Sequence, residues 1–149
     1  MNRFCLHAVL LAVAGLFAAG ADARECAPRI EDAWIRLLPG GMPMHAGFGR
    51  IENRCATAVT IVSASSPAYA SAELHETRMV DGVSRMRPVP QLRIAPNTAA
   101  VLKPGGLHLM LMRPVAPLTP GSKVAVRFAL KDGGVLQGEF EVRQPQPSN

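Results

Sequence analysis

Short apolar or alternating segments, separated by turn residues, are the feature that most constrains how this chain can fold. Helix-like spacing of apolar residues is almost absent, and glycine, proline, asparagine and aspartate lie between the segments. Many short strands at this spacing are typical of an all-β fold, and we expect a Greek-key β-sandwich or barrel. The expected strands span residues 33–37, 46–52, 57–64, 72–80, 83–89, 91–94, 99–102, 107–112, 123–130 and 135–142.

The Asp81-Gly82 pair predicts the register of one hairpin. Both residues tolerate the positive φ of a two-residue type I′ turn, which would pair Val80 with Val83. This register makes His75 and Met86 diagonal neighbours, near enough to share a metal ion. A three-residue turn would change the register and separate them. The predicted face carries His75, Thr77, Met79, Ser84, Met86 and Pro88, and the opposite, solvent-facing one Glu76, Arg78, Arg85 and Arg87.

The segment 107–112 alternates strictly between leucine and a histidine or methionine. Its three leucines predict a core-facing side, and His108, Met110 and Met112 lie on the other side. A face opposite the core is usually polar, so two thioethers on it are unusual. Methionine is often simple core filler, but thioether sulfur beside imidazole nitrogen favours Cu(I) over harder cations. The pattern therefore indicates a soft-metal site at the rim of the fold.

The spacing of the candidate ligands resembles a known signature. The pattern His75-x10-Met86-x21-His108-x-Met110 is similar to the motif of the periplasmic PCu(A)C-type copper chaperones. The similarity runs over roughly residues 30–143. It includes Asp32-Ala-Trp-Ile-Arg36, Ser65-Ser-Pro67, Glu73-Leu-His-Glu76, Met86-Arg-Pro-Val89 and the segment from Leu102 to Met112.

This resemblance implies a cupredoxin-like β-barrel or sandwich that binds one Cu(I) ion through His75, Met86, His108 and Met110. It implies a chaperone rather than an enzyme, delivering copper for assembly of the Cu(A) centre of cytochrome c oxidase or for periplasmic copper homeostasis. The implied partners are Sco-type thioredoxin-like copper proteins and the Cu(A)-bearing oxidase subunit. Some relatives carry a carboxyl-terminal extension rich in histidine and methionine. Residues 144–149 contain neither, and we expect a disordered tail there.

Other methionines and a histidine lie near these residues in the sequence. Met42, Met44 and His45 are expected in a loop after the first strand, where they would either form an auxiliary metal site or pack without one. Met79 and Met112 share faces with the expected ligands. They are candidates for transient contacts to the metal.

The amino-terminal segment predicts export. A positively charged start, an apolar run and Ala21-Asp22-Ala23 are typical of a secretory signal peptide over residues 1–23, which leaves a periplasmic copper-binding domain at 24–143. Cys26 does not follow a small-apolar lipobox, so we expect neither a lipid anchor nor membrane insertion. In an oxidising compartment we expect Cys26 and Cys55 to form a disulfide. The alternative, a redox-active or metal-binding thiol pair, is disfavoured by their wide spacing.

Charge and motifs argue against several other functions. The formal net charge is +5, but the basic residues are spread along the chain and aromatic residues are few, which disfavours nucleic-acid binding. A blue-copper centre needs a cysteine ligand, and no cysteine follows Cys55. No nucleophile with an orienting base is evident, and Arg24, the expected mature start, is not the histidine that a copper oxygenase would need.

The remaining alternative is a metal-free, exported β-sandwich for adhesion or ligand binding. A monomer is the expected state.

Overall fold

The computed structural model describes residues 26–144, which contain ten strands and no helix. Each strand overlaps one of the ten predicted segments. The predicted signal peptide, and the predicted tail beyond Gln144, lie outside the described residues. No helix able to cross a membrane occurs in the part of the chain that is described. The strands are β1 (Arg29–Arg36), β2 (Met44–Asn53), β3 (Val59–Ser65), β4 (Tyr69–Val80), β5 (Val83–Pro88), β6 (Leu92–Ile94), β7 (Thr98–Leu102), β8 (Leu107–Pro114), β9 (Lys123–Leu130) and β10 (Val135–Arg143).

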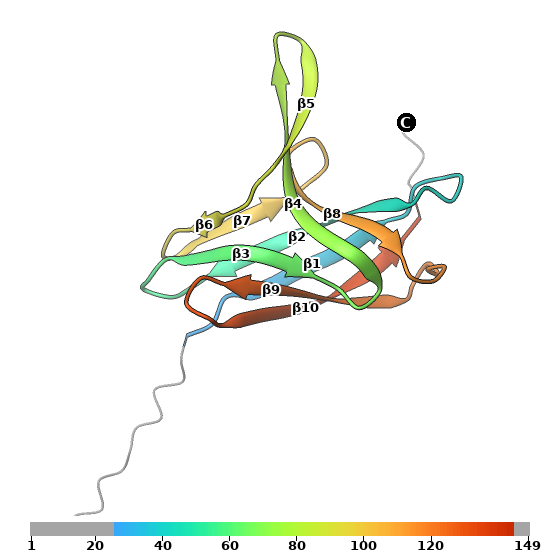
Figure 1. Cartoon of the computed structure of the whole chain (residues 1–149). Coiled ribbons are helices and arrows are strands. Elements are labelled where there is room, and N and C mark those ends of the chain that lie inside the picture. The colour runs from blue at the N-terminus through green and yellow to red at the C-terminus, as the bar shows by residue number, and fades with distance from the viewer. Residues whose placement is uncertain (1–25, 145–149) are drawn as a thin grey trace, which may run out of the picture.

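Most of the strands close into a barrel (Figure 1). Its order is β4-β8-β2-β1-β10-β9-β3, and β3 pairs back to β4 through Ala64 and Ala72. The strands β1 and β10 are parallel, and the other pairs are antiparallel. The short strands β6 and β7 extend the sheet by pairing with β3 and β2. The all-β prediction is confirmed, in the form of a barrel.

The interior of the barrel is filled by alternate residues of its strands. Phe128, Phe140 and Ile35 are almost completely buried, and Leu109 and Leu111 expose no surface. The core-facing side predicted for β8 is therefore confirmed, although Leu107 at its start is only partly buried. Gly47 on β2 lies against Leu109, where an added Cβ would come within 3.1 Å of the leucine side chain. The glycine therefore leaves room for the Leu109 side chain where β2 pairs with β8.

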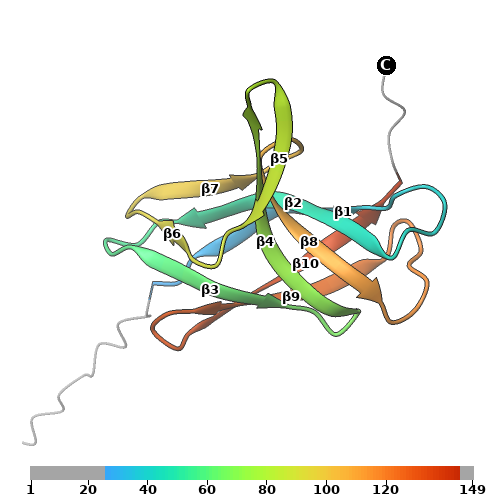
Figure 2. The ribbon, with the colours of Figure 1, turned by 45° about the horizontal axis from the view of Figure 1, so that its top comes forward.

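The hairpin of β4 and β5 projects from the barrel (Figures 1 and 2). Asp81 and Gly82 have φ values of 51° and 76°, as a type I′ turn requires. Val80 pairs with Val83, and the rest of the predicted register follows from that pair. The pairing of β4 with β8 reaches only as far as Glu76, so the remainder of β4 pairs with β5 alone.

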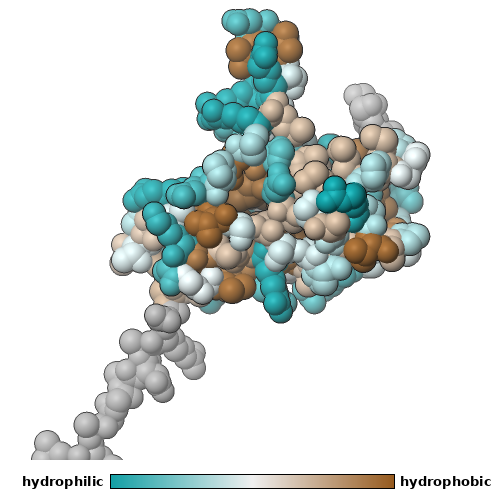
Figure 3. Space-filling model, in the orientation of Figure 1, coloured by the Kyte–Doolittle hydropathy of each residue, from teal (hydrophilic) through white to brown (hydrophobic). Residues whose placement is uncertain are grey.

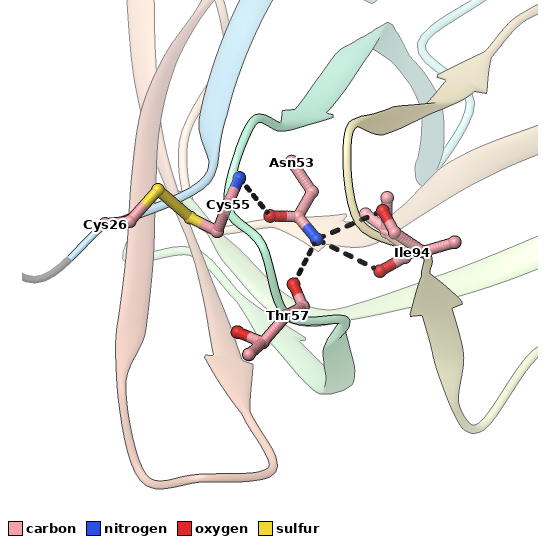
Figure 4. Close-up of a disulfide and its surroundings, with 6 residues drawn as sticks. Cys26, Asn53, Cys55, Thr57 and Ile94 are labelled. Carbon is pink, nitrogen blue, oxygen red and sulfur yellow. Dashed lines mark hydrogen bonds between the residues drawn. A yellow bond between two sulfur atoms is a disulfide. The ribbon is translucent and has the colours of Figure 1, made fainter.

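A disulfide and the buried side-chain amide of Asn53 hold the carboxyl end of β2 in place (Figure 4). Cys26 and Cys55 are joined, as predicted. The fully buried Asn53 side chain donates from Nδ2 to the carbonyls of Thr57, Ile94 and Ala95 at 2.8, 3.2 and 3.1 Å. Its Oδ1 accepts from the backbone N–H of Cys55 at 3.1 Å. Together these bonds attach the segment after β2 to the start of the domain and to the end of β6.

The cross-link should contribute measurably to stability. It joins residues separated by 29 positions, and the chain-entropy model gives about 3 to 4 kcal/mol for a loop of this length. We expect the Cys26→Ser/Cys55→Ser variant to lose about that much free energy of unfolding in urea titrations followed by Trp34 fluorescence. Wild-type protein reduced before unfolding is the matched control, and it should resemble the variant. Equal stability of all three samples would contradict the prediction.

Candidate metal centre

The four predicted ligands meet at the base of the projecting hairpin, on the outer face of the barrel. His75 on β4 lies directly opposite His108 on β8, and their ring centroids are 6.2 Å apart. Met110 follows on the same face of β8. Met86 enters from β5, where it lies opposite Thr77. The β4–β5 register places His75 and Met86 on one face, as the turn predicted, and the β4–β8 pairing adds the other two residues.

Met86 and His108 make the closest contact in this group. The His108 Nδ1 lies 2.8 Å from the Gly106 carbonyl and Nε2 lies 3.2 Å from the Met86 sulfur. Only a protonated Nδ1 can donate to a carbonyl, so in the neutral ring Nε2 carries a lone pair. Two electron-pair donors therefore face each other with no hydrogen between them. A soft cation is the kind of group that satisfies both atoms.

His75 presents a second available nitrogen. Its Nε2 lies 3.1 Å from a carboxylate oxygen of Glu73, whereas its Nδ1 is buried and has no hydrogen-bond partner. Buried polar atoms nearly always have a partner, so this atom requires an explanation. Two imidazoles on one metal, with metal–nitrogen bonds of about 2.0 Å, have ring centroids about 5 Å apart at a tetrahedral angle and about 6.3 Å apart in line. The observed separation of 6.2 Å lies at the upper end of this range, so a four-coordinate ion requires the two rings to approach by about 1 Å.

Three of the four residues line one cavity of about 240 Å³. His75 is not among its lining residues and lies beside it, against His108. His108 and Met110 are buried, at 7% and 9% exposure, whereas Met86 is 53% exposed. Of these three residues, only Met86 is openly exposed to solvent. The cavity is lined by Arg36, Leu38, Met44, His45, Ala46, Phe48, Thr77, Met86, Pro104, Gly105, His108 and Met110.

Residues of the neighbouring strands β1 and β2 account for this burial. Ala46 pairs with Met110, and Phe48 is 2% exposed although it lies outside the main core cluster. The Arg36 guanidinium lies over the Phe48 ring, 5.2 Å from its centroid, and its Nε is buried without a partner. Sequence reasoning missed Phe48 as a cover for the site. Arg36 ends the segment Asp32–Arg36, which resembles the family, and this resemblance was the only sequence feature that pointed to a role at the site.

Of Met42, Met44 and His45, only Met42 lies in the predicted loop, because the other two residues begin β2. Because β2 begins at Met44, strand alternation separates the side chains of Met44 and His45. Met44 pairs with Met112 on the outer face, whereas His45 pairs with the core residue Leu111. His45 is 7% exposed, and its Nδ1 lies 2.8 Å from the Tyr69 hydroxyl. Its packing is therefore that of a core histidine, although its edge reaches the cavity.

The hairpin itself carries apolar and charged side chains side by side (Figure 3). Met79 is 68% exposed on the face that carries His75 and Met86. On the other face, which Val80 and Val83 share at the turn, Glu76 forms ion pairs with Arg78 and Arg87 at 2.8 and 3.1 Å. Hydrogen bonds from these two arginines lower the pKa of Glu76. The register confirms the predicted division of these residues between two faces.

Across residues 26–144 no three His, Cys, Asp or Glu side chains converge as a metal cluster. The two cysteines cannot contribute thiolates while they form the disulfide.

The fold is that of the PCuAC domains. The copper-bound PCuAC domain of PmoF2 matches with a TM-score of 0.65 at 15% identity, covering 79% of this chain and 93% of that one. The Cu(I) form of DR1885 from Deinococcus radiodurans matches with a TM-score of 0.62 at 28% identity, covering 84% and 83%. Residues 29–142 match the family model described as "Putative lipoprotein LpqE-like". The chain therefore belongs to the LpqE-like family.

A relative in Leifsonia xyli subsp. xyli, named as a putative lipoprotein, is 35% identical over 106 residues. The match covers 70% of this chain but only 63% of that relative's length.

His45 should make the stability of the metal-free protein depend on pH. Burial lowers the pKa of His45, so the folded state keeps it neutral where the unfolded chain takes up a proton, below about pH 6.5. The unfolded state then binds more protons, and stability is lost as the pH falls through this range. We expect the free energy of unfolding to decrease from pH 7 to pH 5. A His45→Gln variant should show a smaller decrease; an unchanged slope in that variant would contradict the assignment.

Proposed function

We propose that this protein is a periplasmic copper chaperone that binds one Cu(I) ion through His75, Met86, His108 and Met110. The contact between the Met86 sulfur and the His108 Nε2, at 3.2 Å and without a hydrogen between them, carries the proposal. The unpartnered Nδ1 of His75 supports it, because it offers a further buried nitrogen in the same group. The copper-bound PCuAC structures named above add support from relatives in fold.

The donor set favours Cu(I) over other common cations. Thioether sulfur is a soft ligand that selects Cu(I), whereas Zn²⁺ and Cu(II) sites usually contain harder or anionic donors. The four proposed ligands are neutral in the form that binds metal. The Arg36 guanidinium lines the same cavity and repels a doubly charged cation more strongly than a singly charged one. The soft ligands and the nearby guanidinium both favour Cu(I) over doubly charged cations.

The uneven exposure of the ligands suits release of the ion to a partner. Met86 is half exposed on the projecting hairpin, whereas His108 and Met110 are buried. An incoming ligand can therefore replace Met86 first, while the barrel still holds the ion. A thiolate-bearing acceptor binds Cu(I) more tightly than neutral thioethers, so transfer runs toward it. Sco-type thioredoxin-like proteins and the Cu(A) subunit of cytochrome c oxidase are the acceptors we propose, on the family resemblance.

Export to the periplasm is part of the proposal. The signal-peptide pattern predicts secretion, and a disulfide between Cys26 and Cys55 is typical of oxidising compartments. The LpqE-like family and the Leifsonia relative are both named as lipoproteins. In this chain the Cys26 sulfur is bonded to Cys55, so Cys26 is not available for lipid attachment while that disulfide persists.

The ligand set is tested by titrating the metal-free protein with Cu(I) under anaerobic conditions against a competing chelator. We expect about one equivalent to bind, and the Met86→Ala/Met110→Ala variant to lose at least about tenfold in affinity, since removing even one supporting group commonly costs 10- to 100-fold. The matched control is Met42→Ala, which removes an exposed methionine that does not line the cavity and should leave affinity nearly unchanged. Absence of binding would favour a metal-free adhesion or ligand-binding domain, and binding indifferent to Met86 and Met110 would overturn the proposed ligand set.

Delivery is tested by mixing the Cu(I)-loaded protein with a purified Sco-type domain and separating the two by size. We expect most of the copper to elute with the acceptor, because its thiolates form the stronger bonds. An acceptor whose cysteines are replaced by serine is the control, and it should remain metal-free. Copper that stays with this protein in the presence of intact acceptor would contradict the chaperone role, even if binding is tight.

A further inference from the structure

We infer that Glu73 is a positioning residue for the metal centre. By accepting a hydrogen bond from the Nε2 of His75, it directs the metal to the Nδ1 of that ring. It also places a negative charge beside neutral ligands. This inference rests on the proposed Cu(I) site, and it assigns a role to a residue outside the ligand set.

The placement of Glu73 follows from the strand geometry. Glu73 and His75 are two positions apart on β4, so they share the outer face of the barrel. Glu73 lies opposite Met110 on β8, as His75 lies opposite His108. Glu73 is therefore a neighbour of two proposed ligands within the sheet. Its oxygen lies 3.1 Å from the His75 Nε2, while 51% of the Glu73 side chain remains exposed.

Hydrogen-bond chemistry then determines the tautomer of His75. A carboxylate can only accept, so the stable neutral ring carries its proton on Nε2 and leaves a lone pair on Nδ1. The opposite tautomer would face a lone pair toward the carboxylate and bury an N–H without an acceptor. The orphaned Nδ1 is thus the atom left for a metal. A carboxylate commonly orients a metal-binding histidine in this way.

The two histidines of the site are oriented by different acceptors. Nδ1 of His108 donates to the Gly106 carbonyl, which leaves Nε2 for the metal. Nε2 of His75 donates to Glu73, which leaves Nδ1. The site would therefore use unlike nitrogens from its two imidazoles. The Gly106 carbonyl also accepts from the backbone N–H of Thr77 at 3.1 Å, so it is fixed by the base of the hairpin.

Glu76 provides a matched comparison within the same strand. It directly follows His75 in the chain, but it lies on the opposite face, where Arg78 and Arg87 bind it. Substituting Glu76 removes the same charge at a similar sequence distance without touching the imidazole. Any effect that is specific to Glu73 therefore reports its contact with His75.

The first measurement is the tautomer of His75 in metal-free protein, read from long-range ¹H–¹⁵N NMR spectra at neutral pH. We expect the Nε2–H form for His75 and the Nδ1–H form for His108. Glu73→Ala should release His75 into a mixture of tautomers. Glu73→Gln, whose amide oxygen still accepts a hydrogen bond, should retain the wild-type form. Glu76→Gln should leave both rings unchanged.

The second measurement is Cu(I) binding by the same set of proteins, with the ¹⁵N shifts recorded on loading. We expect the metal-induced shift on Nδ1 of His75 and on Nε2 of His108. The Cu(I) affinity should fall by about 10- to 100-fold in Glu73→Ala, less in Glu73→Gln, and not in Glu76→Gln. Thermal unfolding of each variant verifies that the barrel is intact, which we expect because Glu73 is half exposed.

The outcomes separate this inference from the proposed function. A wild-type protein that binds no Cu(I) overturns the proposed function and the inference with it. Normal wild-type binding overturns the inference alone if the shift appears on Nε2 of His75, which would mean that the metal displaces Glu73. Unchanged Cu(I) affinity in Glu73→Ala would overturn it equally.

Discussion

The antiparallel pairing of β4 with β8 is the constraint on which the rest of the site depends. It places Leu74 opposite Leu109 inside the barrel and His75 opposite His108 outside it. A slip of one residue would exchange the two faces and expose the leucines. Burying a leucine side chain contributes about 1.5 to 3 kcal/mol, so the core residues fix the register. The position of the two imidazoles is therefore a consequence of apolar packing on the other side of the same strands.

The second structural element of the site is the departure of β4 from the barrel. Beyond Glu76 the strand loses its β8 partner and continues with β5 as a projecting hairpin. This division gives the proposed ligands two different environments. His108 and Met110 belong to the rigid barrel wall and are covered by β1 and β2, whereas Met86 belongs to the hairpin and faces solvent. A site with one accessible ligand over two buried ones can hold an ion and still admit a competing ligand.

Polar contacts complete the arrangement by determining which atoms are free. The Gly106 carbonyl occupies Nδ1 of His108, and Glu73 occupies Nε2 of His75, so each ring offers its other nitrogen. The two buried side-chain atoms without partners in the described chain, on His75 and Arg36, both belong to residues at or beside this site. A metal ion would satisfy the histidine nitrogen. In a folded domain, unsatisfied groups of this kind are expected at functional positions rather than in the core.

The local sequence determined a large part of this protein. Alternation at a period of two indicated all ten strands and the face on which each candidate ligand lies, and the Asp81-Gly82 turn fixed the hairpin register because turn geometry is a local property. Alternation also separates Met44 from His45, a consequence missed because the start of β2 was misplaced. What the local pattern cannot specify is which strands become neighbours. That β8 lies between β4 and β2, so that His75 lies opposite His108 and Ala46 lies opposite Met110, was decided by the closure of the barrel. That closure depends on how all of the apolar faces pack together, and its contacts join residues far apart in the chain.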